Sequence, residues 1–424
     1  MNVIFISPHF PLHFWNFCDR LKRLGVNVLG IGDAPYDSLA SEVKNSVGEY
    51  YYVTSLEDYD QVYRAVGYYI GRYGRIDYVE SQNEYWLELE ARLRTDFNIT
   101  SGWKTDELQS VKLKSQMKLG YRRAKVKTAR HHLIDQLDEA LQFATKVGYP
   151  VIVKPDNGVG ASNTWKIGDE ASLNNLYHET LAQYPAHHFI MEEFVPGHIE
   201  TFDGITDAQG NIVFYTGQVM MATPLAMLQG TGENVSYTQN VQATDLNDIG
   251  PRVVKAFGLR NRFFHFEFFR LDEDKKGLGK RGDVLGLEVN MRAPGGYIPD
   301  KMNYAYNVDV YQIWAEALTL GENRSFPNYH FQRYVTHFGR SEKVEYKRSA
   351  DEVRAQLGHK LLLEKVPPKS ISGGMGVQVF VAWSESLPEL EAQARFILER
   401  SDGHYWELAG VNGSNRELTD DSIA

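Results

Sequence analysis

The chain has 424 residues, of which 43% are hydrophobic and 24% charged, the proportions of an ordinary globular protein. Its formal net charge of −10 argues against nucleic acid as a partner, because such proteins usually present a basic surface. Cys18 is the only cysteine, which excludes an internal disulfide and favours a cytoplasmic location. No apolar run approaches the ~18 residues of a membrane span, so we expect no membrane partner.

The first hundred residues alternate short apolar segments with amphipathic ones. This alternation of strand and helix patterns predicts a parallel sheet flanked by helices. The loop after the first strand, SPHFP, lacks the G-x-G-x-x-G pattern, so the sequence does not support a dinucleotide site there. The predicted strands cover residues 3–6, 26–31, 50–53 and 77–80, and the clearest helix covers residues 58–73.

A second α/β unit follows a helical segment that begins near residue 106. Its predicted strands cover residues 151–154, 164–167 and 189–193, and its predicted helices cover residues 135–147 and 170–183. A hairpin at residues 202–217 and a helix at residues 307–320 come next. From residue 326 onward we expect a small α+β unit, with a turn at residues 372–374, a strand at 377–381 and a helix at 388–400.

The stretch from residue 265 to residue 296 carries the clearest chemical signal. Two apolar segments, HFEFF and VLGLEVN, flank a charged turn that contains glycine, which predicts a β-hairpin. Glu288 and Asn290 lie two residues apart and therefore share one face of their strand, and Glu267 can face them from the neighbouring strand. Such a set of hard oxygen donors suits Mg²⁺, and Arg292 follows on the same face. The alternative is a surface hairpin, but carboxylates inside apolar strands are costly unless they are paired or bound to metal.

Two further segments suggest a phosphate and nucleotide site. Lys154 ends a strand directly before a glycine-containing loop, DNGVGASN, whose backbone N–H groups could approach phosphate oxygens. A hairpin turn with a solvated lysine explains that segment equally well. The run FIMEEFVPGHIE offers an extended link that could contact an adenine edge, although an acidic turn between strands is as good an explanation in isolation.

The order of these segments resembles the ATP-grasp superfamily, and within it the branch of biotin carboxylase, carbamoyl phosphate synthetase and the L-amino-acid ligases. The resemblance covers about residues 1–325, and its most specific parts are FEF around Glu267 and LEVNMR at residues 287–292. It implies an N-terminal parallel-sheet (pre-ATP-grasp) α/β domain at residues 1–105. A two-lobed α+β ATP-grasp domain at residues 106–325 and a small C-terminal α+β domain at residues 326–424 complete the expected architecture.

The resemblance also implies roles for individual residues. Arg292 matches an arginine that holds the acyl phosphate, whereas Glu84 occupies an acidic position to which we assign no role. Leu113 departs from the family pattern, because relatives often have aspartate before the first nucleotide lysine. The expected nucleotide contacts are Lys114, Lys154, Gly158, Gly160, Ala161, Ser162, Glu192, Glu193, Val195 and Glu200, and the expected ligands of two Mg²⁺ ions (Mn²⁺ being possible) are Glu267, Glu288 and Asn290.

The implied activity is that of an ATP-dependent carboxylate–amine ligase that forms a dipeptide-like amide through an acyl phosphate. Its expected partners are small carboxylates and amines, with amino acids favoured, and a homodimer is possible. Water would hydrolyse the acyl phosphate, so we expect a lid, placed at residues 128–190. The segment APGG after Arg292 favours the amino-acid ligases over biotin carboxylase. A bicarbonate-activating enzyme, a phosphotransferase and a non-catalytic nucleotide-binding protein remain as alternatives.

Two segments are expected to border the substrates. Residues 293–309 would form the floor of the substrate site, with Gly295 and Gly296 allowing a close backbone approach. The segment 221–240 is predicted to be a loop beside the acceptor. Within it, Glu233 is either the partner of a substrate ammonium group or a carboxylate that faces solvent.

Overall fold

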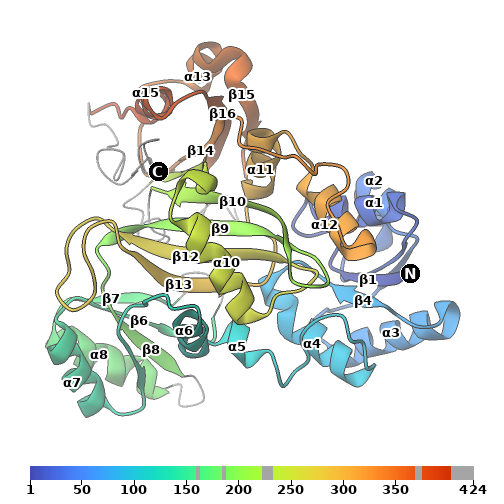
Figure 1. Cartoon of the computed structure of the whole chain (residues 1–424), viewed down its shortest axis with the longest axis horizontal. Coiled ribbons are helices and arrows are strands. Elements are labelled where there is room, and N and C mark those ends of the chain that lie inside the picture. Colours follow the sequence, from blue (N-terminus) through green and yellow to red (C-terminus); the bar gives the residue numbers. More distant parts are fainter. Residues whose placement is uncertain (159–162, 184–187, 222–232, 368–374, 403–424) are drawn as a thin grey trace, which may run out of the picture.

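The structure, a computed structural model, describes residues 1–158, 163–183, 188–221, 233–367 and 375–402. Three sheets organise this part of the chain (Figure 1). The predicted turn at residues 372–374 lies outside the described residues. No helix within these ranges combines the length and the apolar character that crossing a bilayer requires.

The N-terminal sheet has four parallel strands in the order β3-β2-β1-β4, as the strand–helix alternation predicts. Buried valines and isoleucines fill its strands, and helices pack on it because each has one apolar face. The elements are β1 (Asn2–Ile6), α1 (Trp15–Arg23), β2 (Asn27–Gly32), α2 (Ser41–Ser46), β3 (Glu49–Tyr52), α3 (Tyr59–Tyr73), β4 (Tyr78–Glu80) and α4 (Leu87–Asp96).

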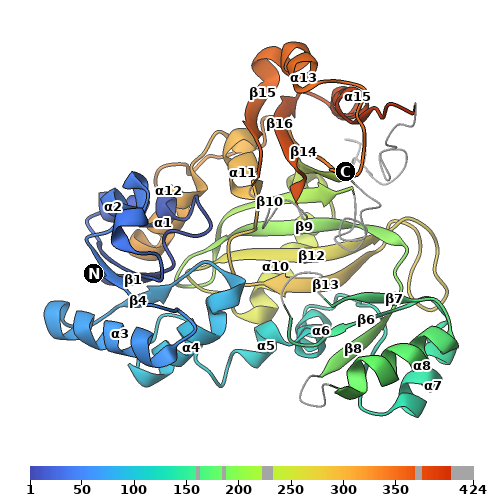
Figure 2. The ribbon, with the colours of Figure 1, turned by 180° about the vertical axis from the view of Figure 1, so that it is seen from behind.

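The second sheet belongs to the segment predicted to be a lid. Its four strands follow the order β5-β8-β6-β7, and all the pairs are antiparallel. Helices α7 and α8 pack on one face of the sheet, and α5 and α6 lead into it (Figure 2). The elements are α5 (Gln109–Lys112), α6 (Lys114–Arg123), β5 (His131–Ile134), α7 (Leu137–Val147), β6 (Val151–Pro155), β7 (Trp165–Ile167), α8 (Glu170–Glu179) and β8 (Phe189–Glu193).

The largest sheet has eight antiparallel strands in the order β13-β12-β9-β10-β11-β14-β16-β15. Helices α6, α10, α13 and α15 cover one face, and α11 and α12 cover the other. The elements are β9 (Gly197–Thr206), β10 (Ile212–Met220), β11 (Asn234–Gln239), α10 (Leu246–Phe257), β12 (Phe263–Leu271), β13 (Val284–Asn290), α11 (Ile298–Tyr306), α12 (Val310–Leu320), β14 (Tyr334–Arg340), α13 (Ala350–Leu357), β15 (Leu361–Lys365), β16 (Gln378–Ser384) and α15 (Leu387–Leu398).

The predicted fold class is confirmed, since a parallel α/β sheet precedes antiparallel sheets arranged as in ATP-grasp proteins. We retain the domain limits at residues 105 and 325 as a proposal. The large sheet continues past residue 325, because β14 pairs with β11 and β16 pairs with β14. The C-terminal strands therefore extend the sheet that contains the β12–β13 hairpin.

Two segments near the expected substrate site have secondary structure that was not predicted from the sequence, and for residues 221–240 this corrects the expected loop. The segment 298–306 forms helix α11, which begins with Pro299 in its first turn and ends at Asn307 in the left-handed conformation. Its tyrosines and its early proline hide the helical pattern in the sequence. Part of the expected loop at 221–240 is strand β11, and Glu233 does not face solvent. Its carboxylate is buried and accepts hydrogen bonds from the Arg400 guanidinium at 2.7 and 3.1 Å.

Candidate functional site

The hairpin of β12 and β13 places the predicted metal ligands on one face of the large sheet. Glu267 lies directly opposite Glu288, and His265 lies directly opposite Asn290. Residues opposite each other in an antiparallel pair project to the same side, so the two carboxylates and the amide point together. Tyr121 of α6 fixes the hairpin from behind, because its hydroxyl donates to the Glu267 carbonyl (3.1 Å) and the Glu288 carbonyl (2.9 Å).

Glu267 is oriented by a buried chain of polar side chains. His265 Nε2 lies 3.2 Å from Glu267 Oε1, and its Nδ1 lies 2.5 Å from Asp203 Oδ1. Burial disfavours a charged imidazole, but the two carboxylates outweigh burial and raise the pKa of His265 to about 9. A charged His265 therefore stands beside Glu267 at neutral pH and keeps that carboxylate ionised.

Lys114 joins the hairpin to the glycine-containing loop. Its ammonium group lies 3.3 Å from Glu288 Oε1 and donates to the Gly158 carbonyl at 2.8 Å. Lys114 is buried at the start of α6, where the adjacent Ser115 is tied to Asp156 by two hydrogen bonds of 2.7 Å. The structure thus brings two predicted nucleotide contacts together with a predicted metal ligand. The other loop residues, Gly160, Ala161 and Ser162, lie outside the described residues.

Lys154 forms a second cluster of positive charge together with Lys118, which was not predicted from the sequence. Lys154 and Lys118 hold the two oxygens of Glu192 at 2.6 and 2.5 Å. Burial alone would raise the pKa of Glu192, but the two ammonium groups hold it well below its usual range. Lys118 could have been found by its spacing, because it lies four residues after Lys114 and shares a face of α6 with it.

The link between β8 and β9 has its side chains engaged by neighbours. Glu193 accepts hydrogen bonds from the Arg130 side chain at 2.6 and 3.0 Å, and Val195 packs in a small apolar cluster. Lys275 donates to the carbonyl of Phe194. The Glu193 N–H and the carbonyls of Phe194 and Pro196 also have partners within the protein, so contact of this link with an adenine edge remains a proposal.

Glu200 is held by two bases at the start of β9. Arg270 donates to both of its oxygens at 2.7 and 2.9 Å, and His198 Nε2 lies 3.3 Å away. Burial opposes ionisation, but these partners hold the pKa of Glu200 down to about 2. The carboxylate is therefore charged and rigid. Its predicted contact with a nucleotide remains a proposal.

Arg292 follows β13 and faces the N-terminal sheet. Its Nε lies 3.6 Å from Glu84 Oε2, and its Nη1 donates to the Ala293 carbonyl at 2.9 Å. Burial raises the pKa of Glu84, which follows β4 in a short turn of 3-10 helix. Glu84, to which the sequence assigned no role, is therefore the carboxylate beside Arg292.

The donor set fits a hard cation bound together with a nucleotide. Among the described residues, no group of three or more His, Cys, Asp and Glu side chains is arranged to hold a metal by itself. Glu267 and Glu288 supply two carboxylates and Asn290 an amide. Mg²⁺ is usually held by one or two carboxylates plus phosphate oxygens and water, so the protein does not need a full cage.

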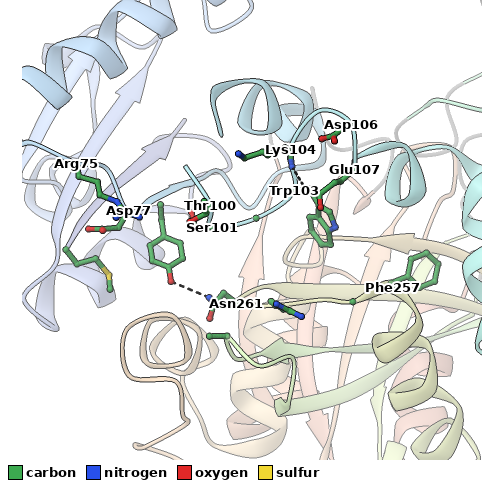
Figure 3. A pocket seen from close by; sticks show the side chains of 16 residues that line it. Arg75, Asp77, Thr100, Ser101, Trp103, Lys104, Asp106, Glu107, Phe257 and Asn261 are labelled. Atoms are coloured by element: carbon green, nitrogen blue, oxygen red, sulfur yellow. Dashed lines mark hydrogen bonds between the residues drawn. The ribbon is translucent and has the colours of Figure 1, made fainter. Parts of the chain in front are cut away.

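A separate pocket of about 960 Å³ opens between residues 100–107 and the end of α10 (Figure 3). Asn261 donates to the Tyr78 hydroxyl at 3.3 Å at its edge, and Arg75, Lys104 and Asp106 line it. Its lining contains no predicted site residue. We therefore place the chemistry at the hairpin, where the cations and carboxylates converge.

The described part of the chain has the fold of ATP-grasp proteins. Residues 112–221 match the family described as the ATP-binding domain of the carbamoyl-phosphate synthase L chain. This segment contains Lys114, Lys154 and the β8–β9 link. The predicted resemblance is therefore confirmed for the fold and for the nucleotide-binding segment.

Individual relatives are distant. The L-arginine-specific L-amino acid ligase of Bacillus subtilis is 25% identical over 334 residues, which is 75% of this chain and 74% of the relative. The carbamoyl phosphate synthase large chain of Thermotoga sp. is 24% identical over 195 residues, 45% of this chain but only 17% of that relative. The crystal structure of the L-amino acid ligase from Bacillus licheniformis superposes with a TM-score of 0.66 at 17% identity, covering 96% of this chain and 99% of that one.

Proposed function

We propose that the chain is an ATP-dependent ligase that joins a carboxylate to an amine. The main support for this proposal is the position of Lys114. Its buried ammonium group contacts both Gly158, in the glycine-containing loop, and Glu288, one of the two carboxylates of the hairpin. The match of residues 112–221 to an ATP-binding domain supports ATP as the nucleotide. The relative that aligns over 75% of this chain is named as an L-amino acid ligase, which supports amino acids as substrates.

In the proposed reaction, a substrate carboxylate attacks the γ-phosphate of ATP and ADP leaves. Lys114, Lys154 and Lys118 neutralise charge on the phosphates, and Glu267, Glu288 and Asn290 would hold Mg²⁺. When bound, Mg²⁺ would supply Lewis-acid stabilisation of the negative charge on the phosphates. The substrate amine then attacks the acyl phosphate, an amide forms and phosphate leaves. Arg292 would stabilise the anion that develops in this step.

Water must be kept from the acyl phosphate. We propose that residues 128–190, which contain the small antiparallel sheet, form the lid. Lys114 of α6 links this segment to the hairpin, because it donates to the Gly158 carbonyl and lies 3.3 Å from Glu288 Oε1. The proposed ribose contact of Glu200 and the adenine contacts of residues 192–195 lie where this sheet passes into β9.

The test is turnover with Mg-ATP and a mixture of the twenty amino acids, followed by phosphate detection and mass spectrometry. We expect ADP, phosphate and an amide in equal amounts. Glu288→Ala should abolish turnover, whereas Glu273→Ala, an exposed glutamate in the turn of the same hairpin, should keep it. A stable phosphorylated product would instead indicate a phosphotransferase. Turnover that depends on bicarbonate would indicate a carboxylase-type enzyme, and no turnover with any acid would contradict the proposal.

A further inference from the structure

A band of polar side chains crosses one buried face of the large sheet. Direct cross-strand pairing puts Glu267 opposite Thr201, Asp203 opposite Thr216, and Ser236 opposite His337. Since opposite residues share a face, the band runs without interruption from the hairpin across β9, β10 and β11 to β14. Its members are Asn290, Glu288, Glu267, His265, Thr201, Asp203, Thr216, Gln218, Thr238, Ser236 and His337.

The band is unusual for a covered sheet face. On the opposite face, Phe202, Val235 and Phe338 pack beneath α10, α13 and α15. On the polar face, apolar residues such as Phe263 and Val335 lie at the ends of the strands and pack against α11 and α12. Buried polar groups cost free energy unless they form hydrogen bonds, so we expect the members of this band to have hydrogen-bond partners.

Lys301 of α11 lies over the far part of the band. It is 1% exposed, and its ammonium group donates to Ser236 Oγ at 2.8 Å and to the Ser236 carbonyl at 3.1 Å. Neither of these acceptors is charged, and Asp203, the nearby carboxylate, is already engaged by His265 and Thr201. Burial lowers the pKa of Lys301 to about 7, which an anionic partner would reverse.

Gln218 lies in the middle of the band, and its side-chain amide forms no hydrogen bond with the described residues. The side chain is fully buried on β10, and neither Nε2 nor Oε1 has a hydrogen-bond partner among the described residues. A buried amide left unpaired costs ~1–3 kcal/mol per group, which a ligand could restore. Gln218 stands opposite Thr201 and Thr238, between the hairpin and the strand that contains Ser236.

We propose that Lys301 and Gln218 bind a carboxylate at the far end of a substrate whose other end reacts at the hairpin. This inference rests on the proposed ligase function and specifies its substrate class. Neighbouring strands lie about 4.8 Å apart. Gln218 is two strands from Glu267, a distance of roughly 10 Å, and Ser236 is three strands from Glu267, a distance of roughly 14 Å. An extended chain covers about 3.5 Å per residue. A span of roughly 10–14 Å therefore corresponds to about three to four residues, so the substrate is a short acidic peptide rather than a single amino acid.

The test is a calorimetric titration in the presence of Mg²⁺ and a non-hydrolysable ATP analogue, which requires no turnover. The probes are glycyl-L-glutamate, glycylglycyl-L-glutamate and triglycyl-L-glutamate, each compared with the same peptide carrying glutamine in place of glutamate. We expect at least one acid to bind about tenfold or more tightly than its amide, because a charge-assisted hydrogen bond to Lys301 is lost in the amide.

Lys301→Met should remove this preference while leaving the affinity for the ATP analogue within about twofold. Lys255→Met, an exposed lysine on α10 at the opposite face, is the matched control and should keep the preference. Gln218→Leu removes a buried unpaired amide, so it should fold at least as well as the parent protein and still weaken acid binding. If the parent protein shows no acid preference, or Lys301→Met retains it, the proposal is wrong. Acid preference without any amide product would contradict the ligase function alone.

Discussion

Arg292 is the residue whose role the geometry separates most clearly from nucleotide binding. Its guanidinium lies at the end of β13 beside Glu84, whereas Lys118 and Lys154 pair with Glu192. Arg292→Ala should therefore leave ATP affinity within a few-fold and lower amide formation by roughly 10²–10³, the scale of losing one preorganised donor to a developing oxyanion. Arg292→Lys should recover little, because a point charge does not replace a planar fork.

The control for Arg292 is Arg281→Ala in the exposed turn of the same hairpin. Melting temperature, ATP affinity and product rate would be measured on one preparation of each variant. If Arg292 only held the end of the strand by pairing with Glu84, stability and product rate would fall together, and each folded molecule would keep its normal activity.

Asp300 is expected to make the free energy of unfolding depend on pH. Burial raises the pKa of its carboxyl to about 6, above the ordinary value of 3.8. Between these values the folded state holds a proton that the unfolded state has lost, so stability falls as pH rises from about 4 to about 6. Asp300→Asn should remove this part of the slope and stabilise the protein above pH 6 by on the order of 1–2 kcal/mol.

Denaturant unfolding of the parent protein and Asp300→Asn at pH 4.5, 5.5 and 7 would measure this effect. Asp272→Asn is a suitable comparison, because that carboxylate instead accepts a hydrogen bond from His198 at 2.7 Å. Removing it should destabilise the protein at pH 7. Equal slopes for the parent and Asp300→Asn would show that Asp300 stays ionised in the folded state.

At the element scale, the position of the hairpin depends on its contact with α6. Gly286 of β13 leaves room for the Tyr121 ring, and a Cβ placed there would lie 2.3 Å from that ring. Gly286→Ala should therefore destabilise the protein by about 1–3 kcal/mol. It should also lower turnover, since Tyr121 holds the carbonyls of Glu267 and Glu288.

Gly71→Ala is the matched control for this change. Gly71 lies in the exposed part of α3, and no described atom lies within 4 Å of the position that a Cβ would occupy. Alanine should therefore stabilise the protein by roughly 0.4–1 kcal/mol through helix propensity. Chemical denaturation measures both effects. A neutral Gly286→Ala variant with full activity would show that the hairpin does not depend on α6.

At the scale of the whole molecule, a buried ion cluster ties the N-terminal sheet to the large sheet. Arg262, just before β12, contacts Glu80 of β4 at 3.2 Å and Glu90 of α4 at 2.8 Å, and Arg94 contacts the same two carboxylates. Arg262 also donates to the carbonyl of Met291, the residue before Arg292. The cluster thereby fixes the N-terminal unit against the end of the β12–β13 hairpin.

Arg262→Met should cost about 3–5 kcal/mol, because it leaves two buried carboxylates with one arginine. Adding Glu90→Gln should recover part of that loss by removing the excess charge. Arg260→Met, at an exposed position lining the pocket of Figure 3, should have little effect. Unfolding midpoints in denaturant would compare these variants, and an unchanged midpoint for Arg262→Met would show that the cluster does not stabilise the assembly.

The sequence by itself determined the features that depend on local pattern. Strand and helix periodicity predicted the parallel N-terminal sheet, and alternation within HFEFF and VLGLEVN predicted the hairpin that sets Glu267 opposite Glu288. Both follow from short-range geometry, in which the spacing of residues along the chain fixes the direction of their side chains.

Only the tertiary structure decided which distant groups meet. Lys118 and Lys154 share Glu192, Arg292 finds Glu84, and Lys301 reaches Ser236 across 65 positions of sequence. Sequence spacing carries no information about such pairs, since they form when helices dock on a sheet whose strand order is not the chain order. The same docking produced α11, because burial of its apolar residues beside Phe214 of β10 and Val335 of β14 stabilises a helix that local propensity alone does not reveal.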